Sequence, residues 1–213
     1  MSFFRSLLLA LVLVSATSAA RAVQVDTLVI PSAAMRKTYS AAVVLPASYA
    51  KNKKAHYPVL YLLHGAYGHF ADWLKNTPDK LLVADLADQY NLIIVLPEGE
   101  TFAFYLDSPV SPDSQFETCL TKEVLPKIDQ TYRTVADCRG RVITGLSMGG
   151  HGARYLSARH PDLYCAAGSM SGALDLMSYN RTLSPPMQPS APSFGHPSWA
   201  RKPITPSASP PTR

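Results

Sequence analysis

Short apolar runs recur along the chain and predict the strands of a buried sheet. Residues 58–63 and 92–96 are continuously apolar, without the polar alternation of a half-exposed strand. Such runs are typical of strands covered on both faces of a parallel sheet. Residues 142–144 form a third core strand, and residues 25–30 and 40–45 are two earlier strands that would form an opening hairpin.

A helix is predicted over residues 77–91, between the first two core strands. Thr77 would cap it, Pro78 would occupy its first helical position, and Asp79 would favour the positive end of its dipole. Asn91 would end it, directly before the next apolar run.

Two more helices follow further along the chain. Residues 116–132 have a helical pattern that Pro126 would kink or restart, and a helix over residues 149–159 would stop before Pro161. With another apolar run at residues 166–170, strands and helices alternate. This alternation predicts an α/β fold with a mainly parallel sheet and right-handed crossovers.

Composition and charge narrow the class of protein. Hydrophobic residues make up 47% and charged residues 16% of the 213 residues, as in an ordinary globular domain. The net charge of +5 comes partly from the two ends, since no Asp or Glu follows Asp175. The basic balance therefore indicates no nucleic-acid partner.

The first 22 residues are typical of a signal peptide. Arg5 precedes an apolar run over residues 7–14, and small residues follow it, with cleavage expected after Ala20 or Ala22. A bilayer requires roughly 20 apolar residues, so this run is too short for a transmembrane anchor. We expect export to the periplasm or beyond, with no membrane anchor after cleavage.

Three cysteines, Cys119, Cys138 and Cys165, would then mature in an oxidising compartment. One disulfide with one free thiol, or three buried thiols, are both compatible with the sequence. Their spacing indicates no metal site.

The organisation changes near residue 176. Nine of the 18 prolines lie in residues 184–213, which excludes helix interiors and central strands there. The predicted domains are a signal peptide at 1–22, an α/β domain at 23–176, and a Pro- and Ser-rich tail at 177–213, expected to be disordered or extended.

The stretch G-L-S-M-G-G at residues 145–150 carries the main chemical signal. Ser147 lies between a predicted strand and a predicted helix, with glycine two positions before and after it. This is the arrangement of a nucleophile elbow, in which a tight turn exposes the serine hydroxyl at a helix N-terminus. We therefore predict that Ser147 is a nucleophile.

A serine nucleophile needs two donors for the oxyanion that develops during acyl transfer. One would be the backbone N–H of Met148, directly after the nucleophile. The other should come from the loop after the first core strand, which begins with His64, Gly65 and Ala66. We predict the N–H of Ala66 as this second donor.

Several motifs resemble the esterase D family of α/β-hydrolases. They are Y-P-V-L-Y-L-L-H-G-A-Y-G at 57–68, V-L-P-E-G at 95–99, F-Y-L-D-S-P at 104–109, E-V-L-P-K-I-D-Q-T-Y-R-T at 123–134, and G-L-S-M-G-G-H-G-A with the later R-H-P-D-L-Y and S-M-S-G-A-L-D. The family includes S-formylglutathione hydrolases, feruloyl and acetylxylan esterases, and mycolyltransferase antigens. The resemblance spans about Val25 to Leu176.

The resemblance implies an α/β-hydrolase fold and serine ester chemistry, with no metal or organic cofactor. The partner would be a small-molecule or polysaccharide-linked ester. In relatives the loop that contains Asp107 lies near the active-site mouth, so Asp107 is expected to line the pocket. His64 and His69, in the loop with Ala66, are expected there too.

The catalytic acid and histidine are not identified. In this fold they follow the serine along the chain, yet only 66 residues follow Ser147 and the last 30 are Pro-rich. His151 should point along the helix, His160 would lie about 20 Å away, and His196 falls in the tail. His56 and His69 precede the serine, and Asp175 would still lack a histidine.

Two hypotheses follow from this break in the pattern. The first is an exported serine esterase whose second half is lost through truncation or a shifted reading frame, which resequencing of the gene would test. The second is a non-catalytic fragment or binding module that kept the pocket. An acyltransferase of the same fold is a third possibility.

Overall fold

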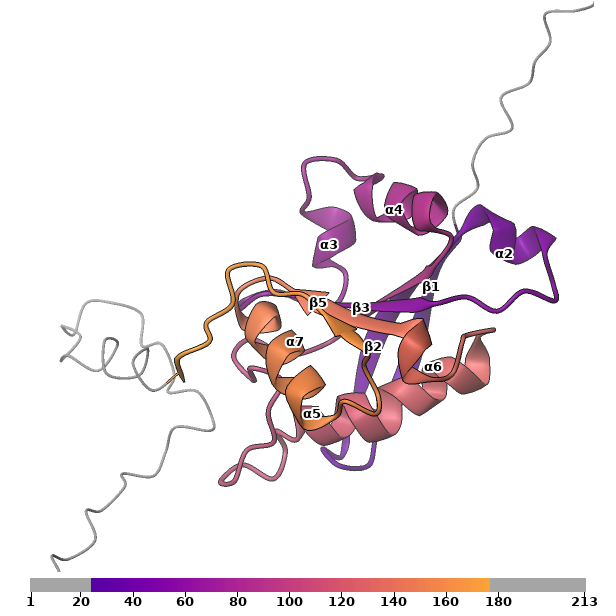
Figure 1. Ribbon diagram of the computed structural model, residues 1–213. Coiled ribbons are helices and arrows are strands. Elements are labelled where there is room, and N and C mark those ends of the chain that lie inside the picture. Colours follow the sequence, from indigo (N-terminus) through magenta and orange to yellow (C-terminus); the bar gives the residue numbers. More distant parts are fainter. Residues whose placement is uncertain (1–23, 177–213) are drawn as a thin grey trace, which may run out of the picture.

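The computed structural model describes residues 24–176, which form a six-stranded mixed sheet with helices on both faces (Figure 1). The strands are β1 (Gln24–Ser32), β2 (Lys37–Leu45), β3 (Val59–Leu63), β4 (Ile93–Pro97), β5 (Arg141–Gly145) and β6 (Ala166–Ala167). The helices are α2 (Ala47–Lys51), α3 (Asp72–Lys75), α4 (Leu82–Tyr90), α5 (Phe116–Thr118), the π-helix η1 (Cys119–Val124), α6 (Leu125–Thr131), the 3-10 helix η2 (Cys138–Gly140) and α7 (Met148–Arg159).

The strand order β1-β2-β4-β3-β5-β6 places the candidate site. β1 and β2 form the expected antiparallel hairpin, β2 also pairs antiparallel with β4, and the remaining pairs are parallel. From β3 the chain continues to β4, which lies on one side of β3 in the sheet, and β5 lies on the other side of β3. In open α/β sheets, ligands bind at the carboxyl ends of strands where the order reverses in this way.

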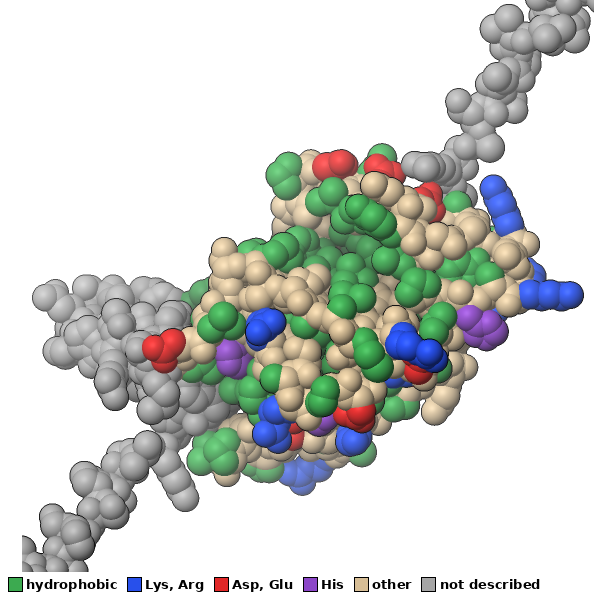
Figure 2. All heavy atoms as spheres, in the orientation of Figure 1, with side chains coloured by type: hydrophobic (Ala, Val, Ile, Leu, Met, Phe, Trp, Pro, Cys, Tyr) green, Lys and Arg blue, Asp and Glu red, His purple; other side chains and the backbone are tan. Residues whose placement is uncertain are grey.

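Two apolar clusters lie on the two faces of the sheet. The larger one packs beneath α5, α6 and α7, and the smaller one lies under α3 and α4 (Figure 1). Tyr57, Tyr61 and Tyr105 are among the largest fully buried side chains of the first cluster. Hydrophobic side chains also gather at the surface over the middle of the face drawn in Figure 2, between α4 and the α6–α7 side.

The strands predicted at 25–30, 40–45, 58–63, 92–96 and 142–144 are confirmed, but the start of the first predicted helix is wrong. The helix that was expected to begin at Thr77 begins at Leu82. The hydroxyl of Thr77 donates to carbonyl oxygens of Trp73 and Asp79, so Thr77 closes a turn and caps no helix. Its end at Asn91 is confirmed, with Asn91 in the left-handed conformation at φ 51°.

The helical segment predicted at 116–132 consists of three consecutive pieces. Pro126 lies in the first turn of α6, where its missing N–H costs no hydrogen bond within that helix. The π-helix η1 precedes this restart. The strand predicted over 166–170 is shorter than expected, since only Ala166–Ala167 join the ladder, and Met170 forms an isolated parallel bridge with Leu146.

The cysteines form one disulfide and one free thiol. Cys138, at the start of η2, is bonded to Cys165, directly before β6. Cys119 is buried, and burial together with the neighbouring Glu123 carboxylate raises the pKa of its thiol to about 12. Such a thiol is inert at neutral pH. Within residues 24–176, no helix is both long and apolar enough to span a bilayer.

The disulfide should stabilise the edge of the sheet that carries β6. Cys138→Ser combined with Cys165→Ser is expected to lower the free energy of unfolding by about 3 kcal/mol, because the bridge closes a loop with a sequence separation of 27. Urea unfolding with and without a reductant measures this. Wild-type protein should lose stability in the reductant and the double variant should not; an equal response of both would contradict the prediction.

Candidate active site

Ser147 occupies a strained turn between β5 and α7. Its backbone has φ 52° and ψ −111°, a conformation that is unfavourable for residues with a side chain. Hydrogen bonds hold the turn on both sides. The N–H of Ser147 donates to the Met170 carbonyl at 2.8 Å, and its own carbonyl accepts from the N–H of His151 at 2.9 Å. This strand-turn-helix context is the one that the G-x-S-x-G motif requires.

The two flanking glycines are required by the close approach of α7 to the sheet. A methyl group at Gly145 would lie 2.6 Å from the backbone of Gly149. One at Gly149 would lie 2.5 Å from the carbonyl oxygen of Leu63, at the end of β3. No side chain fits at either position, and the first turn of α7 therefore lies directly on the carboxyl ends of β3 and β5.

The hydroxyl of Ser147 has no hydrogen-bond partner within the described residues, and the side chain is half-buried. It stands at the N-terminus of the 12-residue helix α7, whose dipole favours negative charge there. Leu146 and Met170, both about two-fifths exposed, flank it with apolar surface.

The loop after β3 lies beside this turn. A methyl group at Gly65 would lie 3.8 Å from the Cβ of Ser147. The N–H groups of Ala66 and Met148, the two predicted oxyanion donors, lack an acceptor within residues 24–176. The two predicted donors therefore belong to adjacent segments, and Met148 itself is fully buried.

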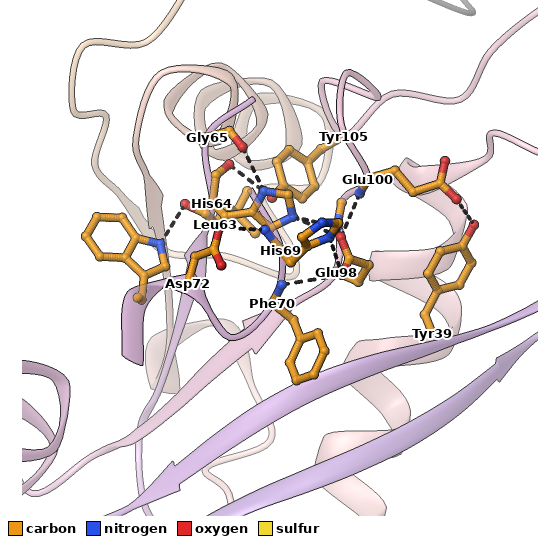
Figure 3. A network of polar contacts seen from close by, with 12 residues as sticks. Tyr39, Leu63, His64, Gly65, His69, Phe70, Asp72, Glu98, Glu100 and Tyr105 are labelled. Carbon is orange, nitrogen blue, oxygen red and sulfur yellow. Dashed lines mark hydrogen bonds and ion pairs between the residues drawn. The ribbon is translucent and has the colours of Figure 1, made fainter. Parts of the chain in front are cut away.

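His64 lies at the centre of a polar network beneath this loop (Figure 3). Its side chain is only 3% exposed. Nδ1 donates to the carbonyl of Gly65 at 2.8 Å, and Nε2 lies 2.9 Å from the N–H of Gly99. Because both ring nitrogens are engaged with the protein, His64 is not available as a base for Ser147, and it supports the loop from below.

Glu98, at the carboxyl end of β4, is the acid of this network. Its Oε1 lies 3.3 Å from Nε2 of His64 and accepts from the N–H of Glu100 at 3.0 Å; Oε2 accepts from Phe70. Burial alone would raise the pKa of Glu98. With the His64 ring protonated, its hydrogen bond and charge, together with the N–H groups of Phe70 and Glu100, outweigh burial and lower the pKa of Glu98 to about 2.

The other two residues expected to line the pocket, His69 and Asp107, bind residues other than Ser147. His69 is 68% exposed, with Nδ1 3.5 Å from Oε2 of Glu98. Asp107 accepts from both the N–H and the hydroxyl of Thr118 and so holds the short helix α5. Its carboxylate is occupied by this contact, which the sequence did not indicate.

No histidine side chain among residues 24–176 hydrogen-bonds to the hydroxyl of Ser147. Nδ1 of His151 lies 3.2 Å from the carbonyl oxygen of Phe104, and burial lowers the pKa of this buried ring. Nε2 of His160 bonds to Glu117 at 2.7 Å. His56 is exposed, and His196 lies outside the described residues. In this part of the chain, no group of three His, Cys, Asp or Glu side chains is arranged to hold a metal ion.

Two supporting residues were missed by the sequence analysis. Glu98 stands within the quoted V-L-P-E-G motif, but nothing local indicated its contact with His64. Tyr105 is fully buried, adopts φ 59°, and donates its hydroxyl to the carbonyl of His64 at 3.2 Å. Its ring also packs directly on Gly99, where a methyl group would overlap it.

The family model described as "Putative esterase" matches residues 32–209, well over half of the chain. The chain belongs to this esterase family. The strand order and helices form the α/β-hydrolase fold of its solved relatives, as predicted. The family's match also includes the segment that carries Ser147.

Individual relatives agree with the family. Esterase Rv1288 of Mycobacterium tuberculosis is 37% identical over 137 residues, which cover 63% of this chain and 29% of that protein. The diacylglycerol acyltransferase/mycolyltransferase Ag85A of the same species is 38% identical over 130 residues, covering 57% of this chain and 37% of that protein. A solved ferulic acid esterase has 34% identity and a TM-score of 0.62, covering 70% of this chain and 59% of that chain.

The chain thus spans about a third of the length of these curated relatives, and somewhat over half of the solved esterase. The matched segments cover 29% of Rv1288, 37% of Ag85A and 59% of the solved esterase.

Gly149→Ala should disrupt the turn at Ser147. The added methyl group would meet carbonyl oxygens of Leu63 and His64 at 2.5 and 2.7 Å, and backbone atoms cannot move aside cheaply. We expect a loss of about 2 kcal/mol in the free energy of unfolding, measured by chemical denaturation.

Gly65→Ala is the matched control. Its methyl group would make ordinary contacts, 3.4 Å from the Leu146 carbonyl oxygen and 3.8 Å from the Cβ of Ser147, so its cost should stay below about 1 kcal/mol. Similar losses for both variants would show that close packing at position 149 is not the cause.

The lowered pKa of Glu98 predicts an acid-dependent contribution to stability. A carboxyl whose pKa falls from 4.5 to about 2 on folding stabilises the protein fully above pH 4.5, and this stabilisation is lost as the pH falls through 2. It amounts to on the order of 3 kcal/mol across the whole titration.

Glu98→Gln removes this titration. The difference in unfolding free energy between the wild type and the variant should therefore shrink as the pH falls from 4.5 toward 2. Urea unfolding at several pH values in this range measures it, and a constant difference would contradict the prediction.

Proposed function

We propose that the chain carries out serine ester chemistry, as the nucleophile-bearing part of a carboxylic-ester hydrolase. The observation that carries the proposal is the placement of Ser147. Its hydroxyl, which has no partner among residues 24–176, stands on a strained turn at the N-terminus of α7, next to the loop that carries Ala66.

In the proposed reaction, Oγ of Ser147 attacks the ester carbonyl carbon and loses its proton. The carbonyl oxygen becomes negative in the tetrahedral intermediate, where the N–H groups of Ala66 and Met148 would donate to it. The C–O bond to the alcohol then breaks, and the alcohol leaves with a proton. Water hydrolyses the resulting acyl-enzyme by the same route and releases the acid.

The histidines of residues 24–176 supply no base for this reaction, since no imidazole ring among them hydrogen-bonds to the Ser147 hydroxyl. A serine with an oxyanion hole alone still gives on the order of 10³-fold over water. Residues 24–176 by themselves are therefore expected to support weak turnover.

The substrate class is inferred from the relatives and from export. The solved relative is a ferulic acid esterase, and the leader-like residues 1–22 with the Cys138–Cys165 bridge support an oxidising compartment outside the cytoplasm. We therefore propose acetyl, feruloyl or short-chain acyl esters in the periplasm or outside the cell.

Acyl transfer is the second candidate, favoured by the 38% identity to Ag85A, named as an acyltransferase. In that case an alcohol replaces water in the second step. Adding an acceptor alcohol during turnover distinguishes the two, since a transferase forms a new ester at the expense of free acid.

A fluorophosphonate probe and p-nitrophenyl acetate test the role of Ser147. Labelling and turnover of the full chain should both be lost in Ser147→Ala, because the probe and the ester react with the same hydroxyl. Ser157→Ala, a change at a serine near the other end of α7, is the control and should retain both. Equal behaviour of wild type and Ser147→Ala would refute ester chemistry at this residue and favour a non-catalytic protein.

A further inference from the structure

Both ends of the loop that carries Ala66 are fastened to the same carboxylate. At the first end, the ring of His64 lies against Oε1 of Glu98, at 3.3 Å. At the other end, the N–H of Phe70 donates to Oε2 at 3.4 Å. Glu98 thus ties residues 64–70 to the end of β4, as Figure 3 shows.

The ring of His64 links the loop to the neighbouring segment. Nδ1 reaches the carbonyl of Gly65, directly before Ala66, while Nε2 faces the N–H of Gly99. That N–H has a second acceptor in Oε1 of Glu98, at 3.1 Å. His64 and Glu98 therefore act together on the same backbone groups.

The backbone of His64 is held as firmly as its ring. Tyr105 donates its hydroxyl to the carbonyl of His64 and packs against Gly99. The indole N–H of Trp73 donates to the carbonyl of Leu63, one residue earlier. The loop can shift only if several of these contacts break together.

A buried charged network is expensive for a fold whose stability could come from apolar packing. His64 is 3% and Glu98 12% exposed, and removing such polar groups from water is unfavourable unless their hydrogen bonds offset it. Apolar side chains of similar size would fill the space but could not bind the Gly65 carbonyl or the Gly99 N–H. His64 and Glu98 therefore fix the conformation of the loop at residues 64–70.

We propose that His64 and Glu98 are positioning residues that fix the N–H of Ala66 opposite Ser147. The proposal rests on the proposed function, because a fixed donor matters only if an oxyanion forms there. An oxyanion donor acts mainly in the transition state, so its displacement lowers kcat and leaves KM nearly unchanged.

Two substitutions separate the bonds of His64. The amide of His64→Asn falls near the position of Nδ1 and can keep the bond to Gly65, while that of His64→Gln falls near Nε2 and can keep the bond to Gly99. Each loses the other bond. We expect kcat on p-nitrophenyl acetate to fall about 10- to 100-fold in both variants and in Glu98→Gln, with KM within about threefold of the wild type.

Glu117→Gln is the matched control. Glu117 is a buried carboxylate that binds Arg159, His160 and Tyr155 at the other end of α7. The same substitution there should lower stability and leave kcat unchanged. If kcat falls equally in Glu117→Gln, or stays unchanged in the His64 and Glu98 variants, the positioning role is overturned.

Hydrogen exchange gives a readout that does not need activity. In the His64 and Glu98 variants, peptides that cover residues 65–70 and 99–100 should exchange faster, while peptides of α7 keep the wild-type rate. If the exchange rate of residues 65–70 is unchanged in these variants, His64 and Glu98 do not hold the loop in place, whatever the activity of the variants. If wild-type protein lacks Ser147-dependent labelling, the proposed function fails and the catalytic role falls with it, whereas faster exchange would still establish the fastening.

Discussion

The parallel pairing of β3 with β5 is the constraint on which the site depends. The register sets Leu63 beside Gly145, so the two strands end at the same level. The loop after β3 and the turn after β5 must therefore emerge side by side. Because α7 begins directly on the carbonyl of Leu63, only glycine fits at position 149, and the N-terminus of α7 is brought to the loop that carries Ala66.

The strain at Ser147 persists because its surroundings hold it from several directions. The Met170 carbonyl, contributed by the segment after β6, accepts its N–H, and the Cys138–Cys165 bridge ties the residue directly before β6 to η2, which precedes β5. On the opposite side, the buried His64 and Glu98 support the adjacent loop. The strained turn at Ser147 thus lies between the disulfide-linked edge of the sheet and the polar network of His64 and Glu98. Strained backbone that its surroundings hold in place is typical of functional sites.

Elements with a strong local signal were predicted well. The strands at 58–63 and 92–96 follow from continuous apolar runs, and the turn at Ser147 between a strand and a helix follows from glycines within two residues of it. The helix start at Thr77 was wrong because its hydroxyl binds carbonyls of the preceding turn, a competing local contact that capping preference does not reveal. The strand at 166–170 is short because pairing with β5 is continuous only at Ala166–Ala167 and resumes as a single parallel bridge between Leu146 and Met170.

The sequence by itself determined the fold class, through apolar periodicity, and indicated the family, through a series of motifs. It also predicts Ser147 as the nucleophile, because the elbow motif depends only on neighbouring residues. The tertiary structure alone decided which cysteines pair and what supports the loop. The contacts of His64 with Gly99 and Tyr105 join residues 35 and 41 positions apart, and Cys138 pairs with Cys165 across 27. These residues contact one another only because the sheet brings the ends of its strands together, and no local sequence pattern indicates such long-range contacts.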